Sequence, residues 1–70
     1  MTEEEFLSKL QKEHAVVLVY LVNGIRLKGR IEDHDDTILF LKNLDNTIVQ
    51  IVYKSAISTI MPEQQVPING

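Results

Sequence analysis

Hydrophobic and charged residues alternate with a period of two directly after the dipeptide Asn23-Gly24. The hydrophobic positions are Ile25, Leu27 and Ile31, and the cations between them are Arg26, Lys28 and Arg30. Alternation after an Asn-Gly turn predicts the second strand of a β-hairpin. Gly29 interrupts the hydrophobic side, and a glycine within a strand marks a bend or a close backbone approach. We therefore expect a bent strand that helps a small barrel to close.

Four further segments have the composition of short strands, at residues 16–22, 37–43, 47–53 and 56–60. Before them, Thr2 and Glu5 match a capping box, and Phe6, Leu7 and Leu10 share one side of a helix predicted for residues 3–12. The pattern predicts one mostly β domain at residues 1–62. An N-terminal α-helix covers one open end of a five-stranded, strongly bent antiparallel barrel. Residues 63–70 are predicted to form a flexible tail.

Size and composition favour self-assembly. The chain has 70 residues and no cysteine, so its small core has no disulfide to support it. The fourth and fifth predicted strands are apolar and contain no charge or proline that would protect an exposed edge. Head-to-tail pairing of such edges closes into a ring when the rotation permits. We therefore expect a ring-forming homo-oligomer.

Several classes of function are disfavoured. The longest apolar run, residues 15–22, is too short to span a bilayer, and an acidic N-terminus is unlike a signal peptide, so a cytoplasmic protein is expected. The net charge is −3, which disfavours a generally basic nucleic-acid binder. His34, Asp35 and Asp36 are expected to form a solvated turn and not a metal site. No nucleophile–base pair or phosphate loop is recognisable, so no enzyme and no cofactor is predicted.

The stretches YLVNGIRLKGRIE, LFLKN and VYKSAISTI, the last followed by a proline, closely resemble the bacterial Hfq family of Sm-like RNA chaperones. The resemblance covers residues 6–62. It implies an Sm-like (SH3-like) barrel in a homohexameric ring that binds small regulatory RNAs and messenger RNAs in post-transcriptional regulation. It also implies a distal face that binds A-rich RNA and a proximal face that binds uridine-rich ends.

The residues that resemble the distal adenine site are Tyr20, Gly24, Ile25, Arg26, Leu27, Lys28, Gln50 and Thr59. In this interpretation an aromatic ring stacks on a base, aliphatic side chains form walls, and an amide reads the adenine edge. Arg26 and Lys28 contact the phosphate groups in this interpretation. The residues alone leave open that Tyr20, Ile25 and Leu27 are only core and interface residues.

The other surfaces depart from the family pattern. On the proximal face, Thr37 stands where the family has an aromatic residue, Asp36 and Ser55 replace a glutamine and a histidine, and Lys54 remains. Uridine binding is therefore expected to be weak or altered. The basic rim is reduced to Lys12 and His14, which could equally serve to stabilise the helix C-terminus. The alternative function is a ring-forming scaffold with little RNA binding of its own.

Overall fold

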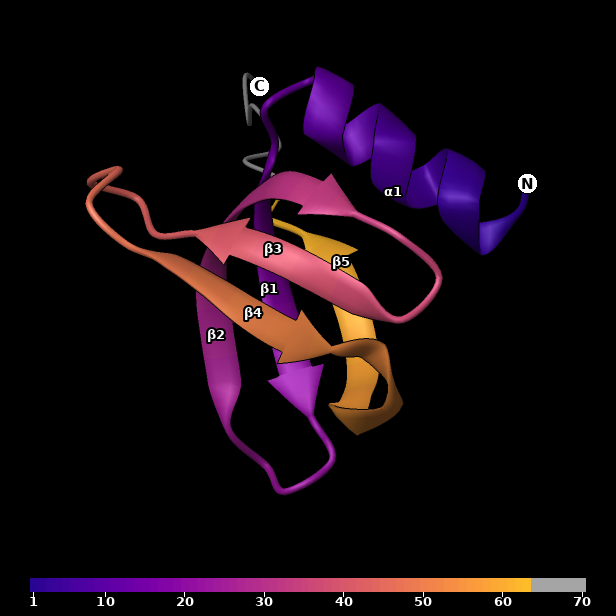
Figure 1. Cartoon of the computed structure of the whole chain (residues 1–70), viewed down its shortest axis with the longest axis vertical. Coiled ribbons are helices and arrows are strands. Elements are labelled where there is room, and N and C mark those ends of the chain that lie inside the picture. Colours follow the sequence, from indigo (N-terminus) through magenta and orange to yellow (C-terminus); the bar gives the residue numbers. More distant parts are fainter. Residues whose placement is uncertain (64–70) are drawn as a thin grey trace, which may run out of the picture.

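The computed structural model describes residues 1–63, so most of the predicted tail, residues 64–70, lies outside the described residues. One helix is followed by five strands and a short 3-10 helix (Figure 1). The elements are α1 (Glu3–Lys12), β1 (Val16–Leu21), β2 (Arg26–His34), β3 (Ile38–Lys42), β4 (Val49–Tyr53), η1 (Lys54–Ala56) and β5 (Ile57–Pro62). All paired strands are antiparallel. The predicted fold class is confirmed.

Helix α1 begins at a capping box, as predicted. The Glu5 backbone N–H donates to Thr2 Oγ1 at 3.1 Å, and the Thr2 backbone N–H donates to Glu5 Oε1 at 2.8 Å. The bond from the Thr2 backbone, followed by that from its side chain, lowers the pKa of the Glu5 carboxyl. Leu7 and Leu10 are only 1% and 5% exposed, so the helix buries its apolar side in the domain core above one end of the barrel (Figure 1).

The five strands form one sheet in the order β4-β3-β2-β1-β5. Strand β2 pairs with β1 through residues 26–30 and with β3 through residues 30–34, with an irregularity between Ile31 and Asp33. Figure 1 shows the sharp change in direction of this strand. A Cβ atom at Gly29 would lie 3.1 Å from the Lys42 carbonyl carbon. The close backbone approach predicted from this glycine is therefore confirmed.

The core is one cluster of aliphatic side chains contributed by the helix and by four strands. Its members are Leu7, Leu10, Val17, Val19, Ile31, Leu39, Leu41 and Val52. Strands β4 and β5 lie at the two ends of the sheet order and are unpaired on one side within the described chain. The outward side chains of β4 remain open, with Val49, Ile51 and Tyr53 exposed by 45%, 56% and 60%. Two free, apolar edges are thus present where they were expected.

Several element boundaries differ from the prediction. Strand β5 continues to Pro62 instead of ending at residue 60, because proline is tolerated on an edge strand. The Glu63 N–H also donates to the Val16 carbonyl at 2.8 Å, so this residue continues the sheet where the tail was expected to begin. Strand β4 begins only at Val49, because Asn43 and Asp45 hold Thr47 in the preceding loop.

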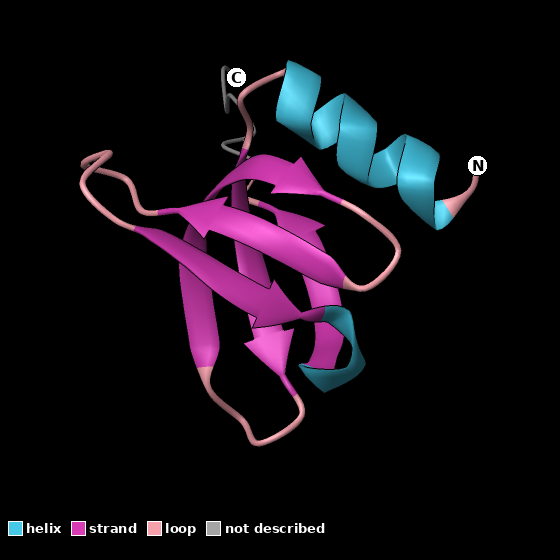
Figure 2. Cartoon of the chain, viewed as in Figure 1, coloured by secondary structure: helices cyan, strands magenta, loops and turns pink. Residues whose placement is uncertain are grey.

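Two connections also differ in detail. The Asp35 carboxylate accepts from the backbone N–H groups of Thr37 and Ile38, each at 2.8 Å, so the turn occupies residues 35–37 and β2 extends to His34. The bonds from Ile38 and then Thr37 lower the pKa of this carboxyl. Between β4 and β5 the predicted tight turn is a 3-10 helix, drawn in cyan in Figure 2. No helix within residues 1–63 is long and apolar enough to cross a membrane.

Candidate RNA interface

Strand register brings three of the predicted distal residues together. Tyr20 lies opposite Arg26 of β2 and opposite Thr59 of β5. Directly opposed residues of antiparallel strands share one face of the sheet, and here that is the outer face, since neighbouring Val19 is fully buried. We call the group Tyr20, Arg26 and Thr59 the stacking cluster. An aromatic ring therefore stands between a cation and a hydroxyl.

The hairpin turn extends this cluster. The Leu21 N–H donates to the Ile25 carbonyl at 2.8 Å, and the Ile25 N–H donates to Asn23 Oδ1 at 3.0 Å. Gly24 has φ +93°, a conformation that residues with side chains rarely adopt. The Ile25 side chain is 52% exposed, so the turn presents an apolar group beside Arg26.

The three cations of β2 are not equivalent. Lys28 Nζ lies 2.7 Å from the Glu63 carboxylate, and Arg30 Nε donates to the His14 carbonyl at 3.1 Å. Within residues 1–63, the Arg26 side chain makes no hydrogen bond or ion pair. The alternating sequence predicted three similar cations, whereas the folded chain leaves Arg26 the least engaged for a phosphate.

Two predicted distal residues do not join the stacking cluster in a single copy of the chain. Leu27 lies opposite Val19 and packs against the core, so its side chain faces the other way. Gln50 lies on β4, opposite the buried Leu41, at the far end of the sheet order from β5. The residue is exposed and accessible to a neighbouring molecule.

The predicted proximal residues meet at the junction of β4 and η1. The Lys54 N–H donates to the Thr37 carbonyl at 2.8 Å, and Asp36 and Ser55 are exposed nearby in sequence. We call Asp36, Thr37, Lys54 and Ser55 the proximal surface. Lys54 Nζ lies 3.4 Å from Glu4 Oε2, and its side chain is only 10% exposed. Its ammonium is therefore already engaged by a carboxylate.

His34 was predicted to belong to a solvated turn, and this is wrong. The residue ends β2 and packs against α1, where its side chain is only 7% exposed. Its Nε2 atom lies 3.1 Å from Ser8 Oγ, and its Nδ1 atom lies 3.3 Å from Glu4 Oε1. No local sequence signal pairs residues 26 positions apart, so only the packing of the helix on the strand reveals this contact. Within residues 1–63, no group of three or more potential ligands is arranged to hold a metal.

The rim residues Lys12 and His14 lie around one hollow of about 480 Å³ that also includes Glu32. Gln11 Nε2 donates to the Glu32 carbonyl at 2.9 Å, and the Glu32 carboxylate lies 3.2 Å from Lys42 Nζ. His14 has φ +54° and lies in the connection between α1 and β1. A carboxylate thus lies beside the rim residues Lys12 and His14, which weakens the local positive potential.

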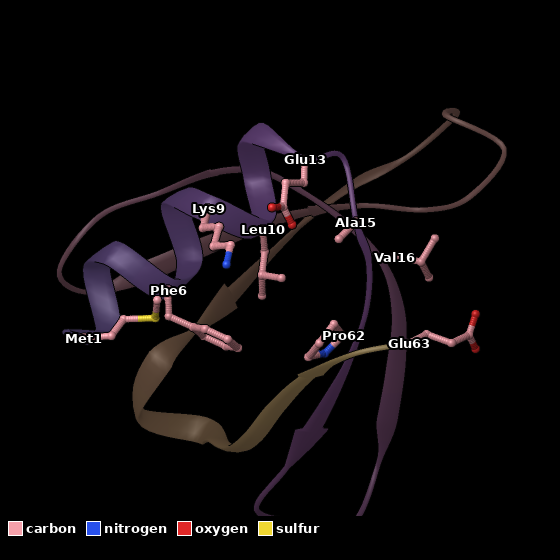
Figure 3. Close-up of a pocket in the computed structure, with 9 residues that line it drawn as sticks. All are labelled: Met1, Phe6, Lys9, Leu10, Glu13, Ala15, Val16, Pro62 and Glu63. Carbon is pink, nitrogen blue, oxygen red and sulfur yellow. The ribbon is translucent and has the colours of Figure 1, made fainter. Parts of the chain in front are cut away.

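A separate hollow of about 600 Å³ lies between α1, the start of β1 and the end of β5 (Figure 3). Phe6, Leu10 and Pro62 form its apolar wall, with Lys9, Glu13 and Glu63 beside them. It contains none of the residues predicted to bind RNA.

Comparisons of the chain with a family model and with solved structures both identify Hfq proteins. The family model described as Hfq protein matches residues 2–67. The chain is similar to a crystal structure of the pleiotropic translational regulator Hfq, with 30% identity over 87% of this chain and 89% of that chain, and a TM-score of 0.80. It is also similar to an Hfq protein from Anabaena sp., with 27% identity over 86% of this chain and 93% of that chain, and a TM-score of 0.76.

Proposed function

This chain belongs to the Hfq family of RNA-binding chaperones, which is not an enzyme family, and on that premise we propose that it binds A-rich single-stranded RNA on the distal face of a hexameric ring. Such a protein acts in post-transcriptional regulation in the cytoplasm, on small regulatory RNAs and messenger RNAs. It performs no chemistry and needs no cofactor. Its action is to hold unpaired strands by stacking, edge recognition and phosphate contact.

The observation that carries this proposal is the stacking cluster. Tyr20 stands between Arg26 and Thr59 on the outer face, with the exposed Ile25 beside the cation. Stacking of a base on an aromatic side chain contributes about 1–3 kcal/mol. Arg26 is the cation of β2 that is least engaged by other groups, so it can meet the phosphate of the stacked nucleotide. An aromatic ring beside a cation is an arrangement that binds unpaired nucleic acid in many proteins.

Ring assembly completes the site in this proposal. The free edges of β4 and β5 support pairing of β4 in one copy with β5 in the next. Such pairing would bring Gln50 of one copy to the strand that carries Thr59 of its neighbour. An amide can donate to and accept from the edge of adenine. Selectivity for adenine would then depend on residues from two copies of the chain.

The proximal surface supports only weak or altered uridine binding. Thr37 offers no ring for stacking, and Asp36 adds a negative charge. Lys54 is already paired with Glu4. In a ring these carboxylates repeat with each copy, so their repulsion of phosphate adds up.

Binding of fluorescent oligo-adenine RNA at about 50 and 200 mM salt tests the proposal. We expect Tyr20→Ala to weaken binding by roughly 5- to 150-fold, which corresponds to about 1–3 kcal/mol for one stacked base. Tyr20→Phe keeps the ring and should bind nearly as the wild type does. Arg26→Ala should reduce the salt dependence, whereas Lys9→Ala, which removes the same charge from α1, should not.

The second candidate is a ring-forming scaffold or modulator that binds little RNA. The engagement of Lys28 by Glu63 and of Lys54 by Glu4 favours it, since both pairs neutralise cations that RNA would need. This function predicts an assembled ring that binds neither oligo-adenine nor oligo-uridine at micromolar concentrations. The same titration therefore separates the two candidates.

A further inference from the structure

We propose that Glu4 is a specificity-determining residue that keeps RNA from the proximal surface by holding Lys54, and that protonation of His34 loosens this hold. The inference rests on the proposed function, because it concerns how RNA is excluded from one face of an RNA-binding ring. It assigns roles to Glu4 and His34, neither of which belongs to the predicted set of binding residues.

The Glu4 carboxylate is shared between two partners. Its Oε2 atom lies 3.4 Å from Lys54 Nζ, and its Oε1 atom lies 3.3 Å from His34 Nδ1. Lys54 is the only cation of the proximal surface, and its side chain is 10% exposed, whereas that of Glu4 is 48% exposed. A phosphate or a uracil carbonyl must therefore displace a carboxylate that is already present. Because Glu4 is open to solvent, its displacement requires no rearrangement of the core.

His34 is the buried member of this group. One ring nitrogen lies 3.1 Å from Ser8 Oγ. The other lies against Glu4 without the geometry of a hydrogen bond, and it is the one buried side-chain polar atom within residues 1–63 that lacks such a partner. The charged and polar groups around the imidazole come from three elements. They are Glu4 and Ser8 on α1, Asp33 and Asp35 on the strand and turn that carry it, and Lys54 on η1.

A change in the charge of His34 alters the competition for Glu4. The protonated ring donates from both nitrogens, so it shares the negative charge of Glu4 with Lys54 and repels the Lys54 ammonium, which weakens the hold of Glu4 on Lys54. It also adds a positive charge beside the proximal surface. Both effects favour an anionic strand when the ring carries a proton. Because an RNA strand contacts several copies in a ring, a modest change at each site is multiplied.

The first test measures hexauridine RNA binding to the wild type and to Glu4→Gln at about pH 8. We expect binding roughly fivefold tighter than in the wild type, as for loss of one competing surface ion pair. Glu13→Gln is the matched control, because it removes the same charge from the C-cap of the same helix, at the end remote from Glu4. Adding Lys54→Ala to Glu4→Gln should abolish the gain. Equal effects of Glu4→Gln and Glu13→Gln, or no effect of Glu4→Gln, would overturn the proposal.

The second test compares wild-type binding of hexauridine at about pH 8 and pH 6. We expect about threefold tighter binding at the lower pH, and a smaller change in Glu4→Gln, where no carboxylate is left to compete for. His34→Gln should likewise reduce the pH dependence of hexauridine binding. This variant distinguishes the effect of His34 from that of the only other histidine in the sequence, the exposed His14. A pH dependence that is equal in the wild type and in Glu4→Gln overturns the role of His34.

Oligo-adenine binding distinguishes this inference from the proposed function. If the wild type fails to bind oligo-adenine, the proposed distal function is wrong. The response of hexauridine binding to Glu4→Gln still decides the role of Glu4 in that case. If oligo-adenine binds and hexauridine binding does not respond to Glu4→Gln, the proposed function stands and the inference falls.

Discussion

The substitution Gly29→Ala tests whether the bend of β2 depends on a close backbone contact. An alanine Cβ would lie 3.2 Å from Leu41 Cγ and 3.1 Å from the Lys42 carbonyl carbon, and nearer still to the Lys42 carbonyl oxygen. The contacted Lys42 atoms belong to the backbone of β3, so the overlap is removed only if β2 and β3 move apart. This is the place where β2 changes its hydrogen-bonding partner from β1 to β3. Overpacking of this kind costs about 1–3 kcal/mol, and we expect about 3 kcal/mol because a carbonyl cannot rotate away as a side chain can.

Gly24 provides the matched comparison. A Cβ there would meet nothing within 4 Å, but the residue has φ +93°. Gly24→Ala should therefore cost only the conformational strain, about 1–2 kcal/mol. Ser58→Ala, at an exposed position of β5, should change stability by less than about 0.5 kcal/mol.

Urea denaturation followed by far-UV circular dichroism measures these differences. All variants must be compared at one protein concentration, because assembly couples stability to concentration. We expect Gly29→Ala to be the most destabilising of the three. A cost below about 0.5 kcal/mol for Gly29→Ala, or a larger cost for Gly24→Ala, would show that steric overlap does not shape this strand.

Three further predictions concern the core, the helix cap and the ring. Leu39→Ala, at a fully buried position, should lower the free energy of unfolding by about 2–5 kcal/mol in the same denaturation assay. Thr2→Ala should cost about 1 kcal/mol. Hydrogen bonds from Thr2 lower the pKa of the Glu5 carboxyl from its ordinary 4.5. The stabilisation by this carboxylate is therefore fully present above pH 4.5 and is lost as the pH falls through the lowered pKa. Denaturation measured between neutral and acid pH should detect the loss. Ile51→Lys places a charge in the middle of the exposed β4 edge, so sedimentation velocity should detect subunits near 8.0 kDa in place of the proposed ring. Leu44→Lys, at an exposed position outside the strand, is the control that should leave the assembly intact.

Most of the fold follows from short-range patterns. The capping box at Thr2 and Glu5 defines the helix start through contacts three residues apart, and the turn at Asn23-Gly24 sets the register of β1 against β2. These features depend on neighbours in the chain, so the sequence contains what is needed to predict them. Strand ends were predicted less well, because side-chain bonds such as that from Thr47 to Asp45 decide where pairing stops.

The candidate site was predicted only in part, since alternation assigns a side chain to a face but does not say which charges meet across the fold. It suggested three similar cations on β2, of which two are engaged by Glu63 and by the His14 carbonyl. The resemblance to the Hfq family grouped Leu27 and Gln50 with Tyr20, whereas in one copy of the chain Leu27 packs against the core and Gln50 lies on the far edge strand.

The sequence by itself determined the helix, the hairpin and the two apolar edge strands, because each results from local geometry or from the period of two along a strand. Only the tertiary structure decided that Glu4 reaches both His34 and Lys54. Those three residues belong to different elements, and the packing of α1 against the end of β2 brings them together. Ion pairs between distant segments depend on the docking of whole elements, which no local pattern specifies.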